Sequence, residues 1–157
     1  MRSESHLLFS MNLLMLLFGP SMPFSHLLIF SFIFAVLPDL DFLIRRYALK
    51  HKDKDLRTWL QEPFGIAFIG IPLAIIAGVM ISPVNAALVL IPYASHVFID
   101  YITMHRVRPL SPFSKKQITV GFIQPAHNPC KFKARLHEHH FLALNMVGFV
   151  VLLLVNR

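Results

Sequence analysis

The sequence predicts an all-α fold: a polytopic membrane bundle of about four to five hydrophobic helices with two basic loops. Three observations support this prediction. The 157 residues are 55% hydrophobic and only 15% charged, and the mean hydropathy is +0.61, outside the balance of an ordinary soluble domain. Apolar runs alternate with short uncharged turns or with basic segments. A chain of this length fits one integral membrane domain, residues 1–157, with spans of roughly 20 residues.

The apolar segments are expected to be helices, because in lipid every backbone N–H and C=O group must be bonded within its own segment. The third and fourth segments are long enough to span a bilayer, whereas the first, second and fifth are short. Gly19-Pro20 separates the first pair and Ser82-Pro83 separates the third from the fourth. In chain order the segments run 6–19, 23–37, 63–81, 83–103 and 140–155.

The basic residues are concentrated in two loops. Of 15 Lys and Arg residues, six lie between Arg45 and Arg57 and seven between Arg106 and Arg135. Basic loops beside membrane helices mark the cytoplasmic side and attract anionic headgroups, so we expect both loops to be cytoplasmic. Membrane lipids and an anionic substrate are the expected partners. The basic residues do not interleave with aromatics on a soluble surface, so a nucleic-acid partner is not expected.

Few ionisable residues lie near membrane depth, and the predicted topology brings them to one face. His6 opens the first helix, Asp39 and Asp41 close the second, and His96 and Asp100 lie in the last turns of the fourth. Such groups cost several kcal/mol unless they are partnered, so they are candidates for a functional site.

Imidazole and carboxylate are the ligand types of zinc, manganese and iron centres in hydrolases. His96 and Asp100 are four residues apart and share one helix face. Pro38 disfavours helical geometry in the residue before it, and a break there would let Asp39 and Asp41 reach one pocket. A divalent metal, with zinc preferred, is therefore one interpretation. The alternative is structural: the aspartates cap the next segment and His96 is a neutral core histidine bonded to Asp100.

Other ionisable residues are placed by the same topology. Glu138, among three histidines, enters the last helix on the cytoplasmic side, and Glu62 precedes the third helix. Either carboxylate is a candidate general base, and the histidines are either further ligands or a solvated interfacial cluster. His26 starts the second helix, roughly 20 Å from Asp39 along the helix axis, so it is excluded from the site. The three histidines are His137, His139 and His140.

These residues resemble a known family, the YdjM-like membrane-bound metal-dependent hydrolases of the inner membrane. Ser-His-Leu-Leu-Phe-Ser at 5–10 resembles its N-terminal histidine motif, and Leu-Pro-Asp-Leu-Asp at 37–41 resembles its L-P-D-[IL]-D signature. The segment 95–103, with Val107 and Pro-Phe at 112–113, resembles its S-H-x-x-x-D-x-x-T block and the stretch after it. The family's fold is thought to be related to zinc-dependent phospholipase C and P1-type nucleases. The resemblance therefore implies hydrolysis of phosphate esters at a multi-metal centre.

One family motif is altered. Where the family has H-R-x-x-T-H-S, this chain has Leu-Arg-Thr-Trp-Leu-Gln-Glu at 56–62, so Leu56 and Gln61 replace the two histidines and Glu62 replaces the serine. If those histidines bind metal, part of the site is lost unless Glu62, His51 or the histidine cluster near Glu138 compensates.

Three hypotheses follow. The first is a membrane-embedded metal-dependent hydrolase of a phosphate ester or lipid-like anionic substrate at the cytoplasmic face. Here the metal ligands are His6, Asp39, Asp41, His96 and Asp100, with Glu138 or Glu62 as base. The second is a catalytically degenerate scaffold, which the altered motif favours. The third is a small transporter, because intramembrane carboxylates and histidines also serve as relays. Against it, the ionisable groups cluster at one face rather than at the midplane.

Overall fold

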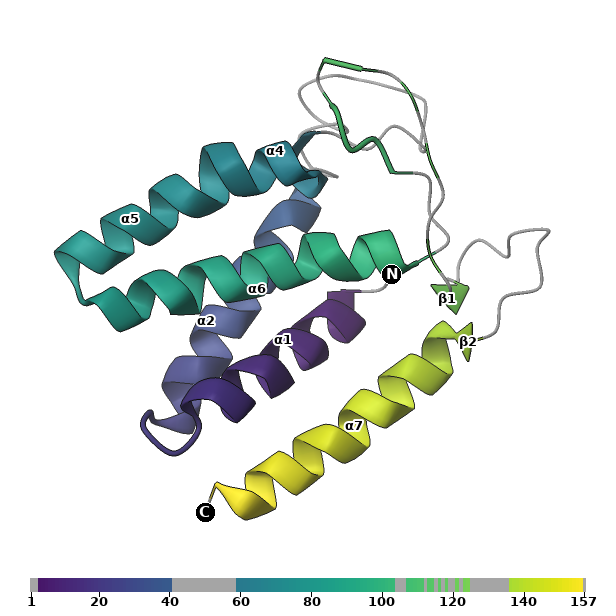
Figure 1. Ribbon diagram of the computed structural model, residues 1–157. Helices are drawn as coiled ribbons and strands as arrows, with labels where there is room; N and C mark the ends of the chain where they lie inside the picture. The colour runs from purple at the N-terminus through teal and green to yellow at the C-terminus, as the bar shows by residue number, and fades with distance from the viewer. Residues whose placement is uncertain are drawn as a thin grey trace.

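A computed structural model of the chain shows a bundle of helices (Figure 1). It describes residues 3–40, 59–103, 107–111, 113–114, 116, 118, 121, 123–124 and 136–156. Three helical segments in this part are long and apolar enough to cross a membrane, and two shorter apolar helices accompany them. The helical elements are α1 (Ser3–Phe18), α2 (Phe24–Val36), η1 (Leu37–Leu40), η3 (Trp59–Gln61), α4 (Pro63–Gly65), η4 (Ile66–Gly70), α5 (Ile71–Met80), α6 (Pro83–Ile102) and α7 (Glu138–Val155).

The predicted fold class is confirmed, and the helix bounds lie close to the expected ones. The third and fourth predicted spans correspond to Pro63–Met80 and Pro83–Ile102. The first and second predicted segments are helices too short to count as full spans, as expected. The fifth is longer than expected, because α7 begins at Glu138 and thereby reaches spanning length.

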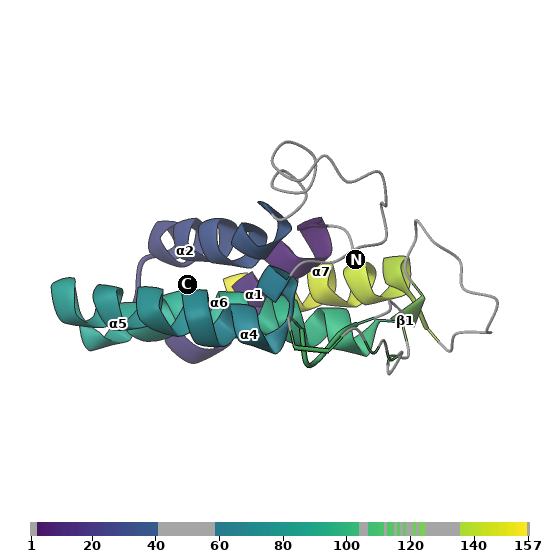
Figure 2. The ribbon, with the colours of Figure 1, turned by 90° about the horizontal axis from the view of Figure 1, so that it is seen from above.

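Helix α1 lies at the centre of the bundle. It contacts α2, α6 and α7, while α6 also packs against α2 and α5. Figure 2 shows α2 lying along one side of the layer that contains α5 and α6. Met11, Leu14 and Leu27 are fully buried between these helices and form a core with Leu88 of α6.

The outer helices expose apolar side chains. On α5, Ile75 is 59% exposed and Val79 is 82% exposed, and Val147 on α7 is 62% exposed. In water such surfaces would be costly, but in a bilayer they face hydrocarbon, and the polar backbone groups are satisfied inside the helices. The bundle is therefore apolar outside, as a membrane domain requires.

Proline and glycine determine where the helices end or bend. Pro83 stands at the start of α6 after the extended residue Ser82, a position where its missing N–H costs nothing. Gly19 closes α1 by donating its backbone N–H to the Met15 carbonyl, and a Cβ there would lie 2.4 Å from that oxygen. The π-helical turn η4 comes just before Pro72, which lacks an N–H for the regular α-helical ladder.

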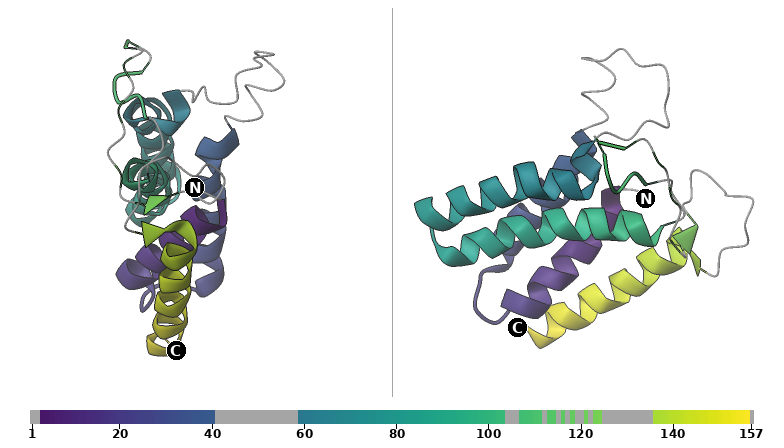
Figure 3. Two further views of the ribbon diagram at one scale, coloured as in Figure 1. Left: turned by 90° about the vertical axis from the view of Figure 1, so that its right-hand side faces the viewer. Right: turned by 45° about the horizontal axis from the view of Figure 1, so that its top comes forward.

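These turns bring five helix ends together on one side of the bundle. The start of α1, the end of α2, the start of α4, the end of α6 and the start of α7 lie toward the same end, as Figure 1 and the right-hand view of Figure 3 show. A two-residue parallel pairing of β1 (Ile123–Gln124) with β2 (Leu136–His137) leads directly into α7. Ile123 also bridges to Thr103 after α6, so this segment crosses the same end.

Candidate metal centre

Three chain segments deliver a cluster of imidazoles and carboxylates to this end of the bundle. His6 comes from the first turns of α1, Asp39 from η1, and His96 and Asp100 from the last turns of α6. His6 is 1% exposed, His96 0% and Asp100 1%. Burial of this degree is rare for titratable groups unless they are paired with each other or with an ion.

The side chains converge on one another. His6 Nε2 lies 3.3 Å from Asp100 Oδ1, and His96 Nε2 lies 3.5 Å from Asp100 Oδ2. Asp39 Oδ1 is also 3.5 Å from His96 Nε2. The two imidazole rings stack with centroids 3.8 Å apart, and one ligand atom from each of His6, His96 and Asp100 lies within 4.8 Å of the others. Asp100 thus bridges the two histidines.

The orientation of His96 is fixed by the backbone of α2. Its Nδ1 lies 2.6 Å from the Ala35 carbonyl oxygen. A carbonyl oxygen only accepts, so Nδ1 carries a proton, and in the neutral ring Nε2 then holds the lone pair. Metal-binding histidines are oriented in this way by a carbonyl or carboxylate behind them. Nε2 is therefore directed at the two aspartates.

The residues fit a divalent cation in charge and in spacing. Two carboxylates face Nε2 of a buried imidazole, an arrangement that needs a positive charge among them, supplied by a bound cation or by a proton on Nε2. Tetrahedral ligation at about 2.1 Å places neighbouring ligand atoms about 3.4 Å apart, which agrees with the measured separations of 3.3 and 3.5 Å. Charge-assisted hydrogen bonds are shorter, about 2.7–2.9 Å.

Asp39 has a different environment from the other members of the cluster. Its side chain is 27% exposed, while those of its neighbours are almost completely buried. Ser3 Oγ donates to Asp39 Oδ2 at 2.7 Å, and Gln61 Nε2 donates to Oδ1 at 3.2 Å. Asp39 therefore marks the side from which water or a ligand reaches the cluster, and two neighbours orient it.

The predicted break in the helix just before Pro38 is not found. Leu37, the residue before Pro38, keeps right-handed helical angles (φ −50°, ψ −43°) rather than becoming extended. The chain instead tightens into the 3-10 turn η1, which redirects Asp39 toward α6. Asp41, the fifth predicted ligand, lies outside the described residues.

Glu62, a predicted base, is fully buried but has structural partners. Tyr101 Oη donates to its Oε2 at 2.6 Å, and the Arg108 backbone N–H donates to its Oε1 at 2.7 Å. These contacts join the start of α4 to the last turn of α6 and the segment after it.

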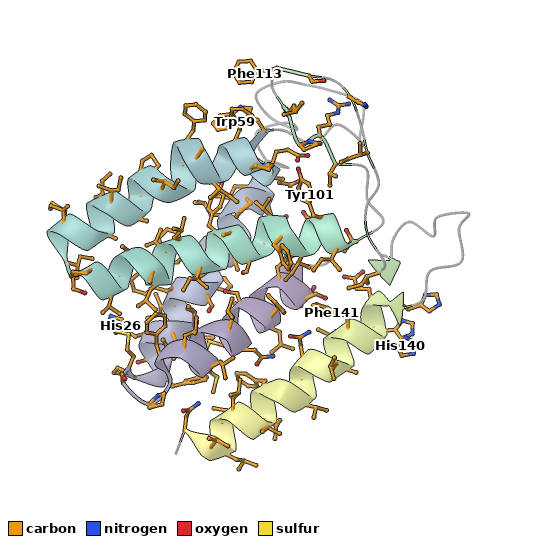
Figure 4. All side chains as sticks on the ribbon, viewed as in Figure 1. His26, Trp59, Tyr101, Phe113, His140 and Phe141 are labelled. Atoms are coloured by element: carbon orange, nitrogen blue, oxygen red, sulfur yellow. The ribbon has the colours of Figure 1, made fainter. Side chains whose placement is uncertain are left out.

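Glu138, the other predicted base, turns inward from the start of α7. It is 3% exposed and accepts a hydrogen bond from Ser5 Oγ at 3.3 Å. Ser5 is the residue before His6 in α1. The neighbouring imidazoles of His137, His139 and His140 are exposed and lie against one another, with centroids 4.3 to 5.9 Å apart. His140 projects outward in Figure 4. His26 lies at the opposite end of the bundle, in agreement with the prediction that it is not part of the site.

The sequence reasoning missed the residues that orient the cluster. Ser3, Gln61 and the Ala35 carbonyl contact Asp39 or His96. A signal existed for Gln61, because it occupies the second histidine position of the altered motif. No pattern in the sequence pointed to Ser3 or Ala35.

The fold and the site together define a class: a polytopic membrane protein with a buried histidine–aspartate cluster at one end of its helices. The chain belongs to the YdjM inner membrane protein family, whose family model matches residues 1–157, the whole chain. Comparisons with curated proteins and with solved structures find no match.

Proposed function

We propose that this chain is a membrane-embedded, divalent-metal-dependent hydrolase that acts on a phosphate ester at the cytoplasmic face. The observation that carries the proposal is the orientation of His96, whose Nδ1 is held by the Ala35 carbonyl while Nε2 faces Asp39 and Asp100. An imidazole and two carboxylates directed at one point, with His6 beside them, form a typical ligand set for zinc, manganese or iron.

Each residue has a role in this proposal. His6, His96 and Asp100 would hold the metal from the buried side, and the partly exposed Asp39 lies where water and substrate enter. A divalent cation supplies Lewis acidity, which acidifies water and polarises a phosphoryl oxygen. Glu138 is the better candidate base, because Ser5 connects it to the His6 turn whereas Glu62 is bonded to Tyr101 and Arg108.

The charge pattern supports an anionic substrate. The basic segment 45–57 connects η1 with η3, and the basic segment 106–135 connects α6 with α7. Both connections start from elements that end at the cluster. Basic residues at a membrane surface attract phosphate-bearing molecules, at roughly 1 kcal/mol per residue.

A catalytically inactive scaffold is the second candidate, and Gln61 is the observation that favours it. Its amide donates to Asp39 Oδ1 from the position where the related motif has histidine. An amide is a weaker metal ligand than imidazole. A scaffold of this kind predicts that the purified protein holds no metal.

The first experiment is metal analysis of detergent-purified protein. We expect a divalent metal in the parent and its loss in His96→Ala and Asp100→Ala, with helix content retained. The matched control is His26→Ala, which removes an exposed histidine that stacks on Phe30 at the far end of α2 and leaves the metal in place. Absence of metal in the parent, even after incubation with zinc, manganese or iron, would favour the scaffold.

Activity is tested next, with phosphate esters as substrates. We expect the parent to hydrolyse them in a metal-dependent reaction, and Glu138→Gln to retain metal while losing activity. Activity that survives complete metal removal would contradict the proposed chemistry.

A further inference from the structure

An apolar groove runs along α1, the helix that also contributes His6 to the candidate metal centre. Its volume is about 380 Å³, within the usual range of small-molecule sites. Helix α1 contacts both α2 and α7, and all three helices contribute side chains to the groove. Its lining consists of Glu4, Leu7, Leu8, Met11, Leu28, Leu142, Met146 and Phe149.

We infer that this groove holds an acyl chain of a lipid whose phosphate group reaches the metal centre. The substrate of the proposed hydrolase would then be a phosphate-bearing lipid rather than a soluble ester, and this part of the inference rests on the proposed function.

The groove runs between the interface and the hydrocarbon. Glu4 is its charged lining residue and is exposed, so it marks the end at the membrane surface. From Glu4 to Met11 on α1, and from Leu142 to Phe149 on α7, the lining extends over seven residues, about 10 Å along each helix at 1.5 Å per residue. That is about a third of the hydrocarbon thickness of a bilayer, the depth of the acyl segment nearest a headgroup.

The surface end of the groove and the candidate metal centre share the first turns of α1. Ser3, next to Glu4, donates its hydroxyl to Asp39, the partly exposed member of the cluster. His6 and the lining residue Leu7 are likewise consecutive in α1. A lipid with its chain along Leu7, Leu8 and Met11 therefore has its headgroup at the end of α1 where Asp39 is reached.

The size and lining of the groove suit an acyl chain. Its volume is about 380 Å³, and every lining side chain except Glu4 is apolar. A thin, flexible hydrocarbon chain follows such a groove, and the oligomeric state in the test below distinguishes it from a helix of a second copy.

The test measures lipid retention and activity separately. Met146→Trp and Leu28→Trp place a bulky side chain in the groove from α7 and from α2. Val79→Trp is the matched control, because Val79 lies on the outer surface of α5 and is 82% exposed. Each protein is purified into delipidating detergent, and the retained lipid is identified by native mass spectrometry, with helix content and metal content as checks of folding.

We expect the parent and Val79→Trp to retain a phospholipid, and both groove variants to lose it while keeping their metal. In the activity arm, the groove variants should show a several-fold higher KM for a long-chain lipid phosphate and an unchanged KM for a short-chain ester. Equal lipid retention in groove and control variants, no lipid in the parent, or a change of oligomeric state instead of lipid loss would each overturn the inference. Groove-dependent lipid retention without hydrolysis would leave the groove assignment standing and count against the proposed function alone.

Discussion

Gln61 contributes to the candidate centre through Asp39 and is a positioning residue. It is buried (7% exposed) and donates its amide hydrogen to Asp39 Oδ1, the oxygen that faces His96. Residues that orient a metal ligand typically change metal affinity by about 10- to 100-fold when replaced. We therefore predict that Gln61→Ala lowers metal affinity about tenfold, measured by chelator competition.

The control for Gln61 is another buried amide far from the cluster. Asn85, 5% exposed, bonds to Ser82 at the opposite end of α6. Asn85→Ala should leave metal affinity unchanged. An equal loss of affinity in both variants would show that Gln61 acts through general stability and not through Asp39.

Glu62 illustrates a buried carboxylate with a structural role. It accepts hydrogen bonds from Tyr101 Oη and the Arg108 N–H. We predict that Glu62→Gln destabilises the protein by about 1–3 kcal/mol, because the single amide oxygen replaces only one of the two acceptors and Tyr101 Oη or the Arg108 N–H loses the oxygen to which it donates. Thermal unfolding in detergent measures this loss, and Tyr101→Phe should give a smaller effect of the same sign. Metal content should stay at the parent level, and its loss would instead make Glu62 part of the centre.

The sequence predicted the members of the cluster better than it predicted their surroundings. His96 and Asp100 are one helical turn apart, so the helix alone places them on one face, and their side chains lie 3.5 Å apart. The contact of His96 with the Ala35 carbonyl depends on how α2 packs against α6. Local periodicity carries no information about that packing, which explains why Ala35 was not found.

At the scale of elements, helix boundaries followed from proline, glycine and apolar length, but the internal geometry of the helices did not. The apolar run from residue 63 predicted a helix, and Pro63–Met80 is continuous. The π-helical turn at Ile66–Gly70 within it was not predicted, because it depends on local packing as well as on Pro72. Gly70 faces Tyr93 there, and a Cβ at Gly70 would lie 3.4 Å from the ring. The widened turn therefore sits against α6.

Two asparagines connect α1 to α7 within the bundle. Asn12 Nδ2 donates to the Asn145 carbonyl at 2.8 Å and to its Oδ1 at 3.2 Å. Interhelical hydrogen bonds in membranes contribute about 0.6 kcal/mol on average, and at most about 2. We predict that Asn12→Leu destabilises the fold by about this amount. Asn145→Leu should cost less, because it removes Oδ1 but keeps the backbone carbonyl that accepts the shorter bond. In a double-mutant cycle of thermal or denaturant unfolding in detergent, the effects should be less than additive, and full additivity would show that the two side chains do not interact.

At the scale of the whole molecule, the two ends of the bundle differ in charge. The elements η1 and α6, which carry Asp39, His96 and Asp100, lead into the basic segments, whereas the turns near Gly19 and Ser82 at the opposite end carry no charge. A cation, an anionic ester and a lipid headgroup would all meet at the charged end. The proposed metal chemistry and the acyl-chain groove both require that this end faces a membrane surface.

Reporter fusions in the loops can therefore test which end of the bundle faces the cytoplasm. Since short basic loops are retained on the cytoplasmic side, we predict that a reporter fused after Ser82 is outside and one fused after Lys116 is inside. A fusion after Pro20 should match the first, because both turns lie at the uncharged end. A phosphatase reporter active only outside and a fluorescent reporter active only inside, fused at the same position, should give opposite signals. The same side for Ser82 and Lys116 would contradict the membrane topology, and the reverse assignment would move the candidate metal centre to the external face while leaving the fold intact.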